Sequence, residues 1–197
     1  MKFICVIDPK TTTQNINLLK AYGAKLEYVE EPDEVTGEYL LTRLKRVSQL
    51  LENIPNSYNL NQYSNLCNPF SHRYTVKEIM RFFNGCVDYI FCAVSTCGTI
   101  RGYSECIKEY RYNCKLIAVD AIGSVIFGDT VKKRLIPGHG AAILPPLFQE
   151  SLVDDFLQVS DWDCVSAIMK YKDKIPAGSN CVLIVHDKGI PAAVLHT

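Results

Sequence analysis

The residues best suited to chemistry stand in one short run, Ser95-Thr96-Cys97-Gly98-Thr99. The run separates an apolar, β-branched stretch (88–94) from a stretch with helical spacing that begins at Ile100. A strand that turns at once into a helix leaves several N–H groups unpaired at the positive end of the helix dipole, which suits a phosphate. An ordinary strand–helix turn with Thr99 as N-cap is the alternative, because the nearby glycines do not form a GxGxxG fingerprint.

Three side chains, one within this run and two outside it, could take part in chemistry. Cys97 would stand at a helix N-terminus, which predicts a lowered thiol pKa and some reactivity, although packing beside a phosphate is its more ordinary use. Gln62 has a carboxamide that could bind a substrate carboxylate or remain solvated. His139, between Gly138 and Gly140, could be a mobile base or simply a turn residue. The four histidines have no metal-ligand spacing and no CxxC occurs, so no metal site is predicted.

The composition narrows the choice of partners. The 197 residues carry 21 basic and 21 acidic side chains without a cationic tract, which argues against nucleic acid or an anionic membrane as partner. No apolar run reaches the length of a membrane span, and the first residues lack the layout of a signal peptide. The nine cysteines are scattered and odd in number, which favours free thiols and a cytoplasmic protein.

Alternating strands and helices must position these residues. Apolar runs predict strands at 3–7, 25–29, 88–94, 115–120, 156–159 and 181–186. Helical spacing and capping signals predict helices at 11–22, 39–51, 75–84, from Ile100 onward and at 161–172. This order predicts an α/β fold with three layers, in which helices cover a mainly parallel sheet. Ligands bind such sheets at the carboxyl ends of the strands, where residues 95–99 would lie. The Asn-rich stretch 55–73 is predicted to be a loop, and Thr75 is predicted to open the next helix through a capping box with Glu78.

Six segments, in this order along the chain, resemble the cysteine synthase and cystathionine β-synthase family of pyridoxal-phosphate (PLP) enzymes, fold type II. They are FICVIDPKTTTQNINLLKAYGAKLE, NQYSNLCNP, AVSTCGTIRG, VDAIGSVIFG, KRLIPGHGA and IPAGSNCVLI. The likeness is greatest to the N-(2-amino-2-carboxyethyl)-L-glutamate synthases, which make a 2,3-diaminopropionate precursor of siderophores from O-phosphoserine and glutamate. The resemblance implies β-replacement, in which an amino acid loses its Cα proton and its β-substituent and then accepts a nucleophile.

The resemblance also assigns roles by position. It implies that the PLP phosphate is bound by Ser95, Thr96, Cys97, Gly98 and Thr99, that Gln62 binds the substrate carboxylate, and that Gly138, His139 and Gly140 line the active-site entrance. It divides the chain into residues 1–55, part of a smaller mobile domain, and residues 56–197, part of a larger cofactor-binding domain. Because the family is commonly dimeric, it implies a homodimer or association with a homologue.

The chain departs from the family pattern in two places. The family's Schiff-base lysine and its substrate loop precede the part that matches this chain, and neither Lys77 nor Lys132 stands at the lysine's position. The turn whose serine bonds the pyridine nitrogen is absent between Lys172 and IPAGSNCVLI. We therefore expect a truncated, cofactor-binding portion that is inactive alone. A non-catalytic partner of a full-length homologue and an α/β phosphometabolite-binding protein are the alternatives.

Overall fold

The computed structural model describes residues 2–35, 37, 39–128, 130–132, 134, 136, 138–160, 163 and 167–184. The chain forms two compact units, Met1–Leu60 and Asn61–Thr197. The division falls near the border predicted after residue 55, and the assignment of the units to a mobile and a cofactor-binding domain stays a prediction. Among the described residues, no helix combines the length and the apolar character needed to cross a membrane.

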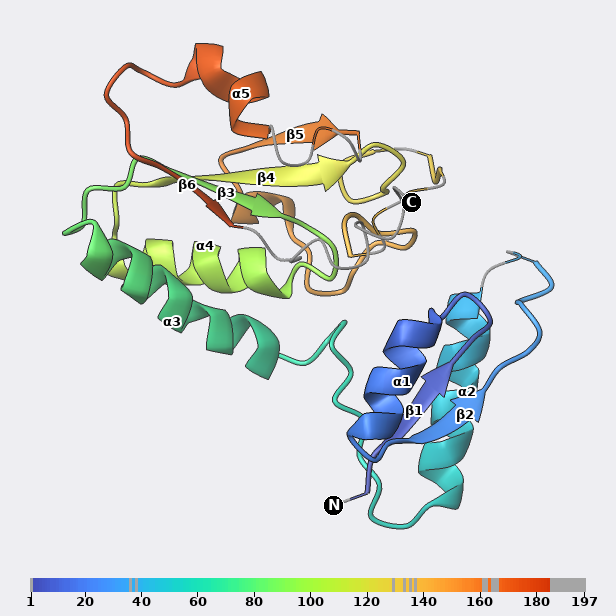
Figure 1. Cartoon of the computed structure of the whole chain (residues 1–197). Coiled ribbons are helices and arrows are strands. Elements are labelled where there is room, and N and C mark those ends of the chain that lie inside the picture. Colours follow the sequence, from blue (N-terminus) through green and yellow to red (C-terminus); the bar gives the residue numbers. More distant parts are fainter. Residues whose placement is uncertain are drawn as a thin grey trace. The chain divides into compact units, whose positions relative to one another are not determined.

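The first unit contains β1 (Ile4–Ile7), α1 (Thr13–Ala21), β2 (Lys25–Tyr28) and α2 (Tyr39–Asn53) (Figure 1). β1 and β2 pair in parallel, with Ile4 opposite Lys25. Thr12 caps α1, because its side chain accepts a hydrogen bond from the amide of Asn15. Neither α1 nor α2 has a buried residue among those described, so this unit contains little core of its own.

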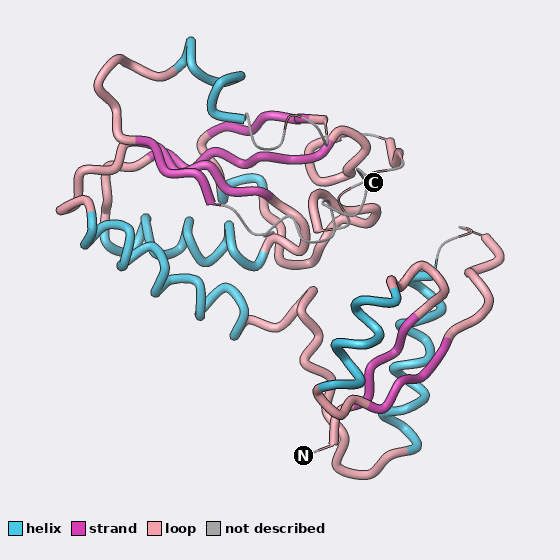
Figure 2. Tube along the Cα trace, in the orientation of Figure 1, coloured by secondary structure: helices cyan, strands magenta, loops and turns pink. Residues whose placement is uncertain are grey.

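The second unit contains α3 (Cys67–Phe82), β3 (Tyr89–Ala93), α4 (Gly98–Tyr110), β4 (Lys115–Ala121), β5 (Asp155–Val159), α5 (Ala167–Tyr171) and β6 (Cys181–Ile184), with short 3-10 turns at Glu150–Leu152 and Lys172–Lys174. The strands form a parallel sheet in the order β5-β4-β3-β6. α3 and α4 cover one face and α5 lies on the other (Figures 1 and 2). The predicted fold class is therefore confirmed.

β3 is buried on both faces. Ile90 and Cys92 pack into the cluster under α3 and α4, whereas Tyr89 and Phe91 pack into the cluster on the α5 side, where they meet Tyr171. A strand buried on both sides has no polar face, which explains why β3 is an uninterrupted apolar run in the sequence.

The predicted loop at 55–73 is wrong in its last part, because α3 already begins at Cys67. The side-chain Oδ1 of Asn65 accepts a hydrogen bond from the Cys67 amide at 2.9 Å, and Pro69 occupies the first turn, where a missing N–H costs nothing. Thr75 therefore lies inside the helix and does not cap it. The predicted helix at 161–172 and the last two residues of the predicted final strand, 185–186, fall wholly or partly outside the described residues.

Candidate functional site

The run Ser95–Thr99 forms the turn between the carboxyl end of β3 and the start of α4 (Figure 1). Within the described part of the chain, the backbone N–H groups of residues 96–100 donate to no other group. The chain turns at Cys97, whose φ of 62° lies in the left-handed region, at a cost of about 1–2 kcal/mol for a residue other than glycine. The turn thus presents consecutive free donors at the tip of an inner strand, as an anion-binding loop requires.

The structure contradicts the prediction that Cys97 has a lowered pKa. The residue is 3% exposed, and burial, with the carboxylate of Asp120 as a smaller cause, raises the pKa of its thiol to about 12. Asp120 is itself buried and accepts hydrogen bonds from the amides of Ala121 and Phe127. The rise of the thiol pKa caused by desolvation therefore outweighs the lowering expected at a helix N-terminus, and Cys97 is a packing residue.

The Gly138–Gly140 segment lies directly against the turn. The amide of Gly140 donates to the carbonyl oxygen of Val94 at 2.7 Å, and the Ser95 hydroxyl donates to the carbonyl oxygen of Gly140 at 3.0 Å. Only a glycine fits at position 140, because its φ is 75° and a Cβ would lie 2.8 Å from Cβ of Ser124. The hydroxyl of Ser95 thus joins the two loops, whereas the backbone amides of residues 96–100 stay free.

The side chain of His139, the middle residue of this segment, is buried. It is 4% exposed, and its Nε2 is 3.0 Å from the carbonyl oxygen of Val119, which can only accept, so Nε2 carries the proton. Its Nδ1 is buried and has no hydrogen-bond partner among the described residues. Gly138 is exposed. A substrate contact stays a prediction for both residues, and for His139 it requires the ring to turn outward.

α3 connects the segment that holds Gln62 to the cofactor turn. The backbone carbonyl oxygen of Gln62 accepts a hydrogen bond from Nδ2 of Asn68 at 3.4 Å. The Asn68 side chain also lies against Gly98, where an added Cβ would come within 2.5 Å of it. One turn further along α3, Nε2 of His72 is 3.2 Å from Oγ1 of Thr99. The backbone of Gln62 therefore lies near the phosphate-binding turn, its side chain is exposed, and a carboxylate contact of its carboxamide stays a prediction.

Asn68 and His72 were missed by the sequence analysis, because it placed both in a loop. Their i, i+4 spacing would have been the signal, since it places two side chains on one face of a helix. Burial lowers the pKa of His72, which keeps its ring neutral near pH 7. No cluster of three or more potential metal ligands is found in the part of the chain that the structure describes.

These features define the class of the protein. It is an α/β protein with an open parallel sheet and an anion-binding type of turn at the carboxyl end of an inner strand. The particular family follows from a sequence comparison: the model of the family described as "Pyridoxal-phosphate dependent enzyme" matches residues 1–185. The chain belongs to this family, whose cofactor is PLP. The free amides and the hydroxyl groups of the turn fit the phosphate of that cofactor.

Solved structures show the same fold. The chain is 24% identical to an O-acetylserine dependent cystathionine beta-synthase from Helicobacter pylori, with a TM-score of 0.80 over 96% of this chain and 69% of that one. It is 23% identical to a hydrogen sulfide-producing enzyme from Fusobacterium nucleatum, with a TM-score of 0.82 over 97% and 70%. It is 19% identical to an O-ureido-L-serine synthase, with a TM-score of 0.84 over 100% of this chain and 67% of that one.

Proposed function

We propose that this chain is the cofactor-binding portion of a PLP-dependent β-replacement synthase that acts on an O-activated serine, such as O-phosphoserine or O-acetylserine. The observation that carries the proposal is the set of free amides at residues 96–100, at the tip of β3. Family membership names the cofactor. The names of two structural neighbours, an O-acetylserine dependent cystathionine beta-synthase and an O-ureido-L-serine synthase, refer to serine derivatives and support the substrate class.

Each part of the site has a distinct task in this proposal. The amides of residues 96–100 and the hydroxyl groups of Thr96 and Thr99 bind the phosphate, and Ser95 holds the neighbouring glycine segment in place. The Gln62 carboxamide donates to the carboxylate of the amino acid. When bound, the cofactor supplies the electron sink for removal of the Cα proton. Glutamate is the proposed nucleophile, which would give the 2,3-diaminopropionate precursor.

Phosphate binding is tested with pyridoxamine 5'-phosphate, which cannot form an imine with a lysine. We expect saturable binding in calorimetry, competition by inorganic phosphate, and much weaker binding of pyridoxamine, which lacks the phosphate. Thr96→Val should weaken binding about tenfold, since a hydrogen bond to a charged group contributes about 1.5–3 kcal/mol. Ser71→Ala, which removes an exposed hydroxyl on α3, is the control and should bind as the wild type does. Equal binding of pyridoxamine and its phosphate would refute the proposal.

The chain alone is proposed to be inactive because neither candidate lysine suits the covalent role. Nζ of Lys77 lies 4.6 Å from the ring centre of Tyr110, the last residue of α4, whereas the cofactor turn precedes the first. Lys132 is exposed, and its amide bonds to the carbonyl oxygen of Gly123. Borohydride treatment with PLP should therefore label lysines without selectivity. A pyridoxyl group fixed on one specific lysine would overturn this part of the proposal.

The small core of the first unit favours association with another chain as a second function, that of a non-catalytic partner. Ile7 and Val29 are its buried hydrophobic residues among those described, whereas Leu18, Leu44 and Leu51 remain exposed. Homodimer formation or co-purification with a full-length homologue would support this function, and a stable monomer that captures no homologue would refute it. We place the protein in the cytoplasm, because the described cysteines are all free.

A further inference from the structure

α3 packs unusually closely against the first turns of α4. A Cβ at Gly102 would lie 2.1 Å from the carbonyl oxygen of Pro69, and one at Gly98 would lie 2.5 Å from the side chain of Asn68. Real Cβ atoms are not found at such distances, so position 102 requires glycine as long as the helices keep this spacing, whereas at position 98 the end of the Asn68 side chain would have to turn away. This close approach brings side chains of α3 within hydrogen-bond distance of the cofactor turn.

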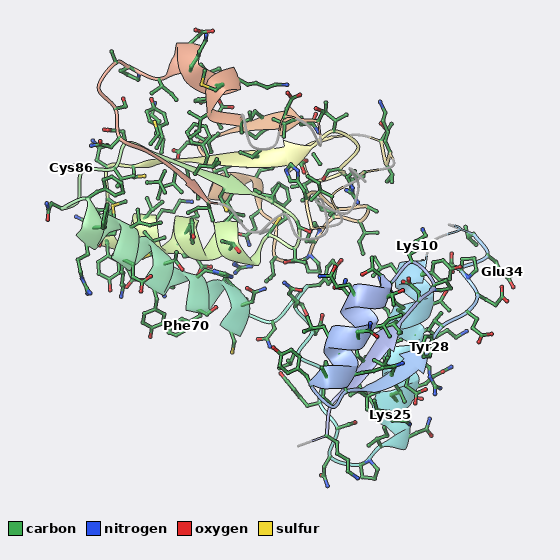
Figure 3. All side chains as sticks on the ribbon, in the orientation of Figure 1. Lys10, Lys25, Tyr28, Glu34, Phe70 and Cys86 are labelled. Carbon is green, nitrogen blue, oxygen red and sulfur yellow. The ribbon has the colours of Figure 1, made fainter. Side chains whose placement is uncertain are left out.

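His72 is the α3 side chain that reaches the turn. Its Nε2 is 3.2 Å from Oγ1 of Thr99, and its ring packs against Tyr103 in an edge arrangement, with the ring centres 6.4 Å apart. Asn68 lies one turn earlier on the same face, whereas Phe70, between the two in sequence, points away from the sheet (Figure 3). The His72 ring is therefore held by α4 from two sides.

The bond between His72 and Thr99 decides where the proton of Thr99 can go. A threonine hydroxyl has one proton, so it can donate to one group only. If Nε2 of His72 were unprotonated, Thr99 would donate to it and would present only lone pairs to an anion. If Nε2 carries the proton, the histidine donates to Oγ1, and the hydroxyl proton of Thr99 stays available.

We propose that His72, as its Nε2–H tautomer, is a positioning residue that donates to Thr99 and thereby directs the Thr99 hydroxyl proton to the cofactor phosphate. This inference rests on the proposed phosphate site. Burial favours the neutral ring, in which only one of the two nitrogens carries a proton. The tautomer therefore decides whether His72 donates to Thr99 or accepts from it.

A double-mutant cycle tests the inference, with pyridoxamine 5'-phosphate as the probe. His72→Leu and Thr99→Val should each weaken binding about tenfold, which is the loss of one hydrogen bond to a charged group. The double variant should bind no more weakly than either single variant, because His72 acts through Thr99. His72→Gln, whose carboxamide can also donate, should bind within about threefold of the wild type. Glu78→Gln, exposed on α3, is the control.

The outcomes separate this inference from the proposed function. A wild-type protein that does not bind the probe refutes the phosphate site itself. Suppose instead that the wild type binds the probe. If His72→Leu then binds it as tightly as Glu78→Gln does, or if the losses of affinity add in the double variant, the role of His72 is overturned and the phosphate site stands. The tautomer is a second readout, independent of any variant's folding: ¹⁵N NMR with saturating phosphate at pH of about 8, above the usual histidine pKa, should show a protonated Nε2 in His72. An unprotonated Nε2 also overturns the inference.

Discussion

The contact between α3 and α4 predicts that a normally stabilising substitution will be harmful at Gly102. In the interior of an exposed helix, Gly→Ala stabilises by about 1 kcal/mol. At Gly102 the new Cβ would lie 2.1 Å from the carbonyl oxygen of Pro69, so α3 would have to move by more than about 1 Å to restore an ordinary contact. Forcing an extra carbon into a packed contact costs about 1–3 kcal/mol, and a clash with backbone belongs at the upper end. The net expectation for Gly102→Ala is a loss of about 2 kcal/mol.

The assay is urea unfolding, with hydrogen exchange of α4 amides as a second measurement that reports on the second unit alone. Gly98→Ala is the matched control, because its Cβ would meet the end of the Asn68 side chain, which can rotate away. It should cost less stability than Gly102→Ala. If Gly102→Ala instead stabilised the protein by about 1 kcal/mol, the close packing of the two helices would be refuted.

Two further predictions follow from burial and charge. Thiol reagents should modify the exposed Cys67 and Cys86 in the native protein (Cys86 is labelled in Figure 3). They should reach Cys97 only on unfolding, because burial raises the pKa of its thiol to about 12. Mass spectrometry of partly labelled protein checks this, and early labelling of Cys97 would contradict it. The hydrogen bond from Lys174 lowers the pKa of Asp155 below its ordinary value of 3.8. The charged Asp155 carboxylate therefore stabilises the folded protein above that pH, and this stabilisation is lost as the pH falls through the pKa of the folded state. Asp155→Asn should therefore destabilise the protein at neutral pH by less than about 1 kcal/mol and should flatten the acid branch of its stability profile, whereas an unchanged acid branch would contradict the assignment.

The order of strands and helices could be predicted from the sequence because burial leaves a pattern. β3 is apolar throughout, since both of its faces are covered, and α2 has amphipathic spacing. The start of α3 could not be predicted in the same way. Its first turn has a proline and an exposed phenylalanine, and the side chain that accepts from its first amide belongs to Asn65, in a stretch already rich in turn formers.

The position of the candidate site was predictable, but the state of its side chains was not. A small-residue run between a strand and a helix leaves few arrangements other than a turn at the strand tip, as residues 95–99 show. The thiol pKa of Cys97 depends on tertiary burial, which no local pattern encodes, and the helix-terminus rule predicted the wrong direction. The burial of the His139 ring could not be predicted for the same reason, because the ring bonds to the carbonyl oxygen of Val119 in β4, twenty residues earlier in the chain.

The glycines of α4 connect the packing of the fold to the chemistry of the site. Gly102 lets the backbone of α3 approach α4, and Gly98 accommodates Asn68 in the same contact. Without that approach, His72 could not come within 3.2 Å of Thr99. A substitution at Gly102 should therefore weaken phosphate binding as well as stability, even though the residue lies two positions beyond the last free amide, that of Ile100. In a protein where Gly102→Ala lowered stability and left the binding of pyridoxamine 5'-phosphate unchanged, the turn would be organised by β3 alone, and the helix contact would serve only the core.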